Sequence, residues 1–190
     1  MHYIIDPPHV LQADVNLPAS KSISNRALII QALTPGAPTP FNLSDCDDTR
    51  VLKDALRLLP SHIDIGPAGT AMRFLTAYLA ITPGEHTLTG SERMRQRPIG
   101  QLVDALRLLG AEIAYEGEEG FPPLRITGKP IMGGKIEMAG DISSQFVTAL
   151  LLIAPVMEKG LTLHLQGRII SRPYIDMTLQ VMRSYGADVE

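Results

Sequence analysis

The sequence has little of what would indicate several common classes of protein. It contains one cysteine, Cys46, so no disulfide framework can form within the chain. Its formal net charge is −3, so no general positive field is available to attract nucleic acid or an anionic membrane. Neither is an expected partner. Any binding of anions must therefore come from cations that are placed locally.

Two further absences narrow the choice. The five histidines are scattered without the spacing of metal ligands, and we expect neither a metal nor another cofactor. No stretch approaches the roughly 18 apolar residues needed to span a bilayer, and the opening residues MHYIIDPPHV lack the pattern of a signal peptide. We therefore expect a cytoplasmic protein.

What the sequence does have is a globular composition and an internal repeat. Its 190 residues are 45% apolar, which suits one large domain or two small ones with a substantial core. Three segments open with small or hydroxyl residues, continue with apolar residues at helical spacing and stop at proline or glycine. They predict helices that are buried on most of their circumference, over residues 22–36, 69–84 and 143–160.

A second predicted helix follows each of the first three. These second helices cover residues 49–59, 97–113 and 172–189. The last two are in register about 75 residues apart. Pro98 and Pro173 are expected in the first turn, where a helix tolerates proline, and Gly110 and Gly186 in left-handed caps at the end.

Strand candidates with alternating apolar residues, each ending in glycine, stand between the helices. They cover residues 85–90, 111–117, 124–128, 135–140 and 161–167. The sequence therefore predicts an α/β (or α+β) domain built from a repeated unit, with the first helix of each unit inside and the second outside. The third unit stops before its last two strands, so we expect a fragment of a longer protein.

The starts of the three inner helices carry an unusual set of polar residues. They lie at Lys21–Ser22, Gly69–Thr70 and Ser143–Gln145. A helix N-terminus offers unpaired amide donors and a partial positive charge. If the repeat brings these ends to one side, they form an anion site, to which Lys21 adds a point charge. Forked donors for phosphate or carboxylate follow at Arg26, Arg73 and Arg97.

Each of these residues also has a purely structural interpretation. The serines and threonines are common helix caps. Arg73 could pair with a buried acid, and Arg97 could be an ordinary solvated residue. The acids Asp45, Asp47 and Asp48 are compatible with a metal site or with the start of a helix, and the helix is favoured.

Five motifs, taken together, identify a family. LPASKSISNRAL, GPAGTAMR, RQRPIGQLVDALRLLGAEI, GDISSQFVTALL and SRPYIDMT follow one another along nearly the whole chain. They resemble the family of 5-enolpyruvylshikimate-3-phosphate (EPSP) synthase, or 3-phosphoshikimate 1-carboxyvinyltransferase. That family has two similar domains, each of three βαβαββ units around buried helices, with the active site between them. The resemblance implies that this chain is the N-terminal half.

The resemblance also implies a division of the chain. Residues 18–190 are expected to form an incomplete substrate-binding domain. Residues 1–17 are expected to be a strand segment, with the strand at 9–17, that belongs with the missing C-terminal domain. That missing domain is thus an expected partner of this one.

The activity that the resemblance implies is that of a transferase in the shikimate pathway, which supplies chorismate and the aromatic amino acids. The family moves the enolpyruvyl group of phosphoenolpyruvate to the 5-hydroxyl of shikimate 3-phosphate and releases phosphate. The two substrates bring about five to six negative charges into one cleft. The carboxylates that transfer protons are expected in the missing half, so the chain alone is expected to bind ligand weakly and not to turn over.

By resemblance, the polar residues singled out above surround the two substrates. Lys21 is implied as a catalytic group in contact with both. The residues implied on the side of shikimate 3-phosphate are Lys21, Ser22, Arg26, Ser143, Ser144, Gln145, Ser171 and Tyr174. Those implied on the side of phosphoenolpyruvate are Gly69, Thr70, Arg73 and Arg97.

Two positions depart from the family pattern next to the phosphoenolpyruvate side. Pro67 stands where the family often has asparagine, and Phe74 stands where proline is common. Both bear on the affinity for phosphoenolpyruvate and for the inhibitor glyphosate.

Two rival interpretations stay open at this point. The enolpyruvyl transferase that acts on UDP-N-acetylglucosamine shares the fold, but its usual loop cysteine has no counterpart near ERMRQRPIG. A non-catalytic scaffold of the same fold would have no need of Lys21, Arg97 and Gln145 together.

Overall fold

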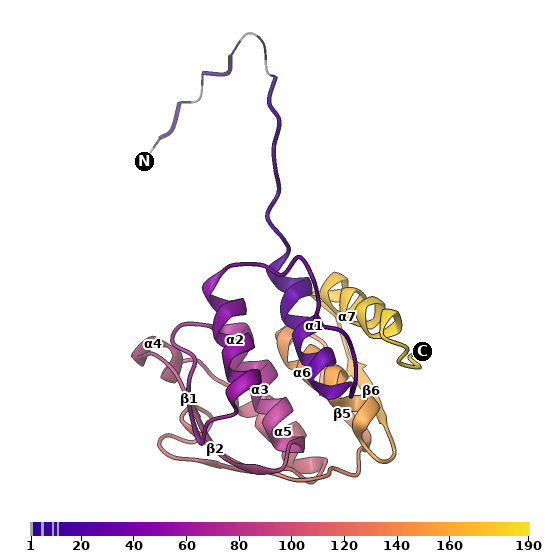
Figure 1. The fold of residues 1–190 in the computed structure, drawn as a ribbon. Coiled ribbons are helices and arrows are strands. Elements are labelled where there is room, and N and C mark those ends of the chain that lie inside the picture. Colours follow the sequence, from indigo (N-terminus) through magenta and orange to yellow (C-terminus); the bar gives the residue numbers. More distant parts are fainter. Residues whose placement is uncertain (1, 5, 9, 11) are drawn as a thin grey trace.

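The repeat in the sequence corresponds to a repeated unit of helices and strands in the structure. The computed structural model of the chain describes residues 2–4, 6–8, 10 and 12–190 (Figure 1). Its elements are α1 (Lys21–Leu33), α2 (Asp47–Leu58), β1 (His62–Asp64), α3 (Gly69–Ile81), β2 (Gly84–Thr89), α4 (Glu92–Arg95), α5 (Gly100–Leu108), β3 (Glu112–Tyr115), β4 (Leu124–Gly128), β5 (Gly134–Ala139), α6 (Ser144–Ile153), the 3-10 turn η1 (Ala154–Val156), β6 (Leu161–Gln166) and α7 (Arg172–Ser184).

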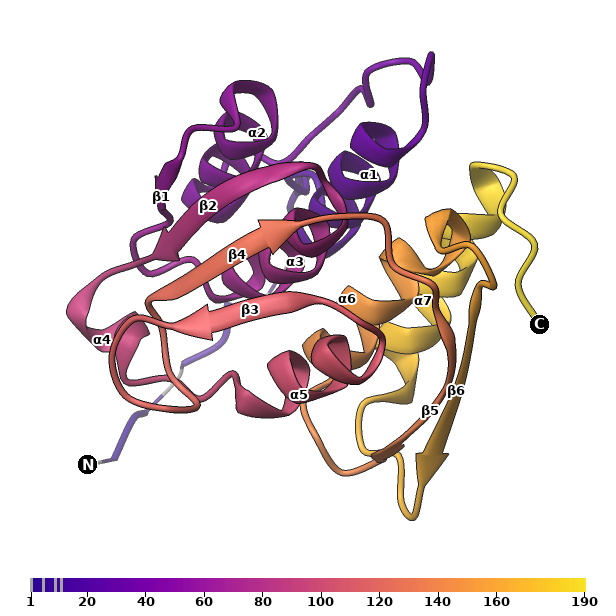
Figure 2. The same ribbon diagram turned by 90° about the horizontal axis from the view of Figure 1, so that it is seen from below.

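The middle unit is a full βαβαββ motif. Its four strands form one sheet in the order β1-β2-β4-β3, with β1 and β2 parallel and the other two pairs antiparallel. Helix α3 packs on β2 and β4, and α5 packs on α3 and β3. Figure 2 shows β2, β4 and β3 side by side, with α3 behind them.

The flanking units contain parts of the same plan. The third unit repeats the parallel strand pair as β5 and β6, with α6 between them and α7 after them. Within the described residues, no strand follows α7. The first unit has its two helices, α1 and α2, and residues 34–46 between them form no strand. The predicted order of helices is therefore confirmed, and the first unit is reduced to helices.

The inner and outer positions of the helices follow the prediction. Helices α1, α3 and α6 contact one another and form the centre of the molecule. Every residue of α3 from Gly69 to Ala80 is buried, including Phe74, which is 1% exposed. In contrast, α2, α5 and α7 each expose one polar face. A helix that is apolar all round needs such a central place, because no face of it is stable in water.

Both predicted glycine caps are confirmed. Gly110 after α5 has φ +102°, and Gly186 after α7 has φ +86°. At each site the glycine amide donates to the carbonyl three residues before it, and the next amide donates to the carbonyl five residues back, at distances of 2.9–3.1 Å. This is the Schellman arrangement, in which glycine adopts the left-handed conformation without steric cost.

Some predicted element boundaries were wrong, and two of them lie beside a proline. Pro173 does lie in the first turn of α7, but Pro98 precedes α5, since the amide of Ile99 donates to the carbonyl of Gly120 and the helix begins only at Gly100. Helix α6 ends at Ile153, short of the predicted residue 160, because Pro155 has no amide hydrogen to continue it.

Two short elements were not predicted at all. Strand β1 has three residues, too few to show an alternating pattern. Helix α4 is a single turn that is capped by Ser91, whose hydroxyl accepts a bond of 3.4 Å from the amide of Met94.

The described residues of the N-terminal segment form no strand. Of the strand predicted at residues 9–17, His9 and Leu11 lie outside the described residues, and residues 12–17 have no regular structure and are exposed. Figure 1 shows this segment extending away from the helices. A strand needs a partner for its amide and carbonyl groups, and residues 12–17 pair with none of the described strands. The assignment of residues 1–17 to another domain stays a prediction.

Among the described residues, none of the helices combines the length and apolar character needed to cross a membrane.

The close packing of β4 on α3 predicts the effect of one substitution. A Cβ on Gly128 would clash with the carbonyl oxygens of Leu79 and Thr82 at the end of α3. We expect Gly128→Ala to lower the free energy of unfolding by about 2–3 kcal/mol, as for overpacking in a core. In the control Gly117→Ala, the new Cβ meets only Pro123 Cδ at 3.9 Å, so urea denaturation should show little change. Equal unfolding midpoints for the two variants would contradict this packing.

Candidate functional site

The N-termini of the three inner helices meet at one pocket. The pocket has a volume of about 350 Å3. It is lined by Lys21, Ser22, Arg26, Thr70, Phe74, Ser143, Ser144, Gln145, Ser171 and Tyr174. The predicted convergence of the helix ends is therefore confirmed. We call this hollow the helix-mouth pocket.

Two of the three inner helices are capped by a serine side chain at their start. Ser20 caps α1 and Ser143 caps α6, each through a bond from an amide of the first turn at 3.3–3.4 Å. The structural interpretation therefore holds for these two serines. Helix α3 has no side-chain cap, because Ala68 stands at that position. The first-turn amides of α3 are thus left for water or a ligand.

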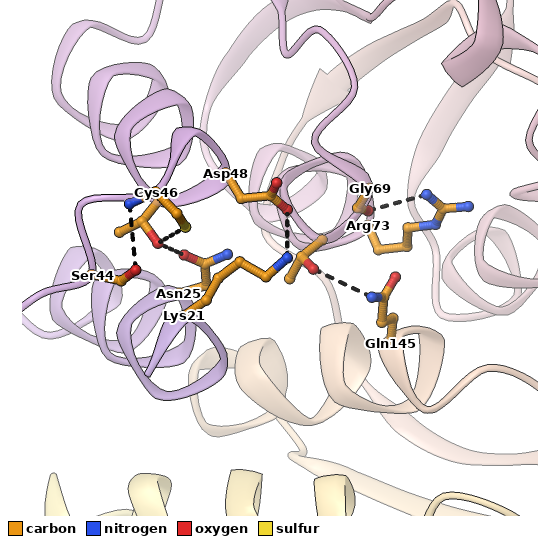
Figure 3. A network of polar contacts seen from close by, with 10 residues as sticks. Lys21, Asn25, Ser44, Cys46, Asp48, Gly69, Arg73 and Gln145 are labelled. Carbon is orange, nitrogen blue, oxygen red and sulfur yellow. Dashed lines mark hydrogen bonds and ion pairs between the residues drawn. The ribbon is translucent and has the colours of Figure 1, made fainter. Parts of the chain in front are cut away.

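Gln145 joins two copies of the repeat at the pocket. Its side-chain nitrogen donates to the hydroxyl of Thr70 at 3.3 Å (Figure 3). The two residues are 75 positions apart and both are the second residue of their helices, α6 and α3. This contact holds the two mouths side by side.

Arg26 is largely used by the protein itself. Its side chain is 3% exposed. It donates to the hydroxyls of Thr178 at 2.8 Å and Thr148 at 3.2 Å, and to the carbonyls of Ser22 at 2.7 Å and Tyr174 at 3.3 Å. Burial lowers the pKa of Arg26 to about 10. The bonds to Thr148, Thr178 and Tyr174 fix α7 against α1 and α6. Four of the five N–H groups of Arg26 are thus used, which leaves one for a ligand.

Arg73 has a similar internal role. It donates to the carbonyls of Gly69 at 3.1 Å and Pro98 at 3.2 Å, and its side chain is 4% exposed. The buried acid that was an alternative partner is not among its contacts. Burial, together with the nearby charge of Arg97, lowers the pKa of Arg73 to about 10. Arg73 thus anchors the loop that carries Arg97.

The remaining predicted residues lie next to the helix-mouth pocket. Arg97 lines an adjoining hollow of about 440 Å3 together with Pro67, Ser91, Arg93 and Met94. Gly69 lies between the guanidinium groups of Arg73 and Arg97, and a Cβ there would come within 3.1–3.2 Å of Arg97 Cζ and Arg73 Nη1. The site predicted as one cleft is therefore two neighbouring hollows. The departure at Pro67 falls in the second hollow, and Phe74 lines the first.

Ser171 and Tyr174 form the wall supplied by α7. Ser171 stands before the first residue of α7 and makes no side-chain cap bond. The ring of Tyr174 is on the surface, with 48% of the residue exposed. Both side chains are thus free to contact a bound molecule.

The sequence interpretation missed the partner of Lys21. Lys21 Nζ lies 3.4 Å from Asp48 Oδ1 (Figure 3). Asp47 and Asp48 are in the first turn of α2, as the helix interpretation of these acids required. Because α1 and α2 come together only in the fold, no local signal in the sequence marks the contact between Lys21 and Asp48. In the described part of the chain, no group of three or more acids, histidines or cysteines is placed to hold a metal ion.

A larger hollow elsewhere is a poorer candidate for anions. It has a volume of about 480 Å3, lies between β6, α6 and α7, and its lining is mainly aliphatic. The only charged residues of its lining are the acids Asp188 and Glu190. Lys21 and Arg26 line the helix-mouth pocket, and Arg93 and Arg97 line the hollow beside it.

The bonds of Arg26 predict a difference between two buried threonines. Thr148→Val keeps the side-chain shape but removes an acceptor from a buried guanidinium, so we expect a loss of about 1.5–3 kcal/mol in the free energy of unfolding. In the control Thr76→Val, the lost hydroxyl donates only to the carbonyl of Met72 within the same helix, and the loss should stay below about 1 kcal/mol. Thermal unfolding measures both variants, and a smaller effect at Thr148 than at Thr76 would contradict this role of Arg26.

Comparison with known proteins gives a consistent answer. Residues 5–64 and 60–190 match the family of EPSP synthase (3-phosphoshikimate 1-carboxyvinyltransferase). The 3-phosphoshikimate 1-carboxyvinyltransferase of Bacteroides fragilis is 59% identical over 187 residues, which cover 98% of this chain and 46% of the relative. That of Shewanella halifaxensis is 43% identical, in a match that covers 98% of this chain and 50% of the relative.

A solved structure agrees with these relatives. EPSP synthase from Acinetobacter baumannii superposes with a TM-score of 0.77 and 25% identity, over 93% of this chain and 44% of that one. The chain thus spans about half the length of the curated relatives it matches. On the match along almost all of its residues, the chain belongs to the EPSP synthase family.

Proposed function

We propose that this chain supplies one face of the active site of an EPSP synthase. In the proposed reaction, the enolpyruvyl group of phosphoenolpyruvate passes to the 5-hydroxyl of shikimate 3-phosphate, and phosphate is released. The observation that carries the proposal is the helix-mouth pocket, in which the start of α1, with Lys21, meets the equivalent starts of α3 and α6. Membership in the family supports the choice of substrates.

The helix-mouth pocket suits shikimate 3-phosphate in charge and in donors. Ser143, Ser144 and Gln145 lie at one helix end, where hydroxyls and amides can donate to phosphate oxygens. Lys21, whose side chain is 47% exposed, brings a positive charge to the same pocket. Tyr174 offers an exposed ring beside it on which the cyclohexene ring of the substrate can pack.

The adjoining hollow suits the second, smaller anion. Arg97 is exposed there, and Gly69 gives room for its guanidinium. A guanidinium binds carboxylate or phosphate through two parallel bonds. We therefore assign this hollow to phosphoenolpyruvate, with Gly69 and Thr70 at its border with the first. Arg73 serves it indirectly, through its bonds to the carbonyls of Gly69 and Pro98.

The lining of the helix-mouth pocket also limits what this face can do chemically. None of its ten residues is an acid or a histidine, so it holds no carboxylate or imidazole to move protons. Lys21 is the one lining group with an exposed charge that can donate a proton. This face therefore binds and orients the substrates, and the carboxylates of the reaction must come from elsewhere in the enzyme.

The binding role of Lys21 can be tested against a closely matched lysine. Lys21 and Lys129 are both 47% exposed and both lie 3.3–3.4 Å from a carboxylate, but only Lys21 lines the pocket. We expect Lys21→Ala to weaken the binding of shikimate 3-phosphate by about 10- to 100-fold, the value of a charge-assisted bond, and Lys129→Ala to have no effect. Isothermal titration calorimetry gives both affinities.

The same titration followed by NMR locates the ligand. Amide shifts are expected at residues 21–22, 69–70 and 143–145 together. Binding without shifts at these three helix ends, or no binding at all, would overturn the proposed function.

The lack of acids in the pocket leads to a separate prediction about turnover. With shikimate 3-phosphate and phosphoenolpyruvate both present, we expect the 190-residue chain to release no phosphate above the background rate. A phosphate-release assay measures this directly. A clear steady rate would show that the chain carries its own proton-transfer groups.

A further inference from the structure

Lys21 and Asp48 form a pair that joins two helices at the edge of the pocket. Lys21 is the first residue of α1, and Asp48 is the second residue of α2. Their closest charged atoms are 3.4 Å apart. Lys21 lines the helix-mouth pocket, whereas Asp48 does not, and the Asp48 side chain is 24% exposed. The carboxylate therefore contacts the ammonium group from outside the pocket.

Two buried hydrogen bonds near Asp48 connect α1 with α2 and with the residues just before it. Thr49, the next residue of α2, donates from its hydroxyl to Asn25 Oδ1 at 2.8 Å. The amide of Ser44 donates to the hydroxyl of Ser24 at 2.9 Å. Asn25 and Thr49 are 0% and 2% exposed. Figure 3 shows the bond to Asn25 beside the ion pair. The start of α2 is thus held rigidly against α1.

We propose that Asp48 is a positioning residue that orients the ammonium group of Lys21 toward a phosphorylated ligand in the helix-mouth pocket. The proposal rests on the proposed function for the identity of that ligand. An ammonium group has three N–H donors, and the bond to Asp48 uses one. The other two are available to phosphate oxygens. A lysine side chain loses much rotamer freedom when it binds, and an existing partner on a rigid helix removes part of that cost before the ligand arrives.

Charge repulsion between Asp48 and the ligand would act in the opposite direction. A carboxylate near an anion site repels the ligand, so removing its charge would strengthen binding if repulsion were its main effect. Positioning and repulsion thus predict changes of opposite sign. The neighbouring Asp47 provides the control, because it lies in the same helical turn but pairs with Arg50 at 3.1 Å and its side chain is 88% exposed.

The first experiment compares Asp48→Asn with Asp47→Asn in the 190-residue chain. Both variants remove one negative charge from the first turn of α2. We expect Asp48→Asn to weaken the binding of shikimate 3-phosphate about three- to tenfold, and Asp47→Asn to change it less than about twofold. In a Lys21→Ala background, Asp48→Asn should have no further effect, which a general structural role would not explain. Unchanged or tighter binding by Asp48→Asn, or equal weakening in both backgrounds, would overturn the proposal.

A second measurement needs no ligand and does not depend on the proposed function. Carbon relaxation of the Lys21 Cε methylene group reports how ordered the side chain is. We expect similar order in the wild type and Asp47→Asn, and clearly lower order in Asp48→Asn. Equal order in all three would overturn the positioning role. If the wild type fails to bind shikimate 3-phosphate while the order still falls in Asp48→Asn, the proposed function fails and the positioning of Lys21 stands.

Discussion

The structure depends on one constraint, the packing of three apolar helices against one another in the centre of a small protein. Helices α1, α3 and α6 are mutual neighbours, and α3 is enclosed by α6, α2, α5 and the four-stranded sheet. The apolar side chains determine this arrangement, but each helix still ends in amide groups that cannot pair within it. Because the repeat aligns the three helices, these amide-rich ends come out at one place. An anion site follows from core packing, before any specific side chain is considered.

The cations of the site have two different roles: buried ones hold the structure in place, and exposed ones are available to a ligand. Arg26 and Arg73 are almost fully buried and donate mainly to hydroxyl and carbonyl oxygens, at the cost of a pKa lowered by burial to about 10. They hold α7, Gly69 and Pro98 in place. Lys21 and Arg97 remain exposed at the two hollows. Arg93 is a further exposed cation of the second hollow. The positive charge that a ligand meets is thus carried by exposed side chains, and Arg26 and Arg73 maintain the geometry in which it meets them.

Features that depend on neighbouring residues could be predicted from the sequence, whereas contacts between distant residues could not. Helical periodicity, hydroxyl-rich helix starts and glycine caps are local, so the inner helices, Gly110 and Gly186 could be predicted. The family motifs supplied the site residues, whose roles remain predictions. Local patterns could not show that Arg26 is used internally, since its partners Thr148 and Thr178 are more than 120 residues away. Nor could they show that Asp48 meets Lys21. Strand β1 is defined by its pairing with β2 and has almost no pattern of its own.

A crystal structure of the chain with shikimate 3-phosphate would show whether the converging helix ends bind a phosphate group. We expect phosphate oxygens about 2.7–3.0 Å from Lys21 Nζ and from the hydroxyls of Ser143 and Ser144, the usual range of charge-assisted hydrogen bonds. A ligand whose phosphate lies on another face of the molecule, with the helix-mouth pocket filled only by solvent, would contradict it.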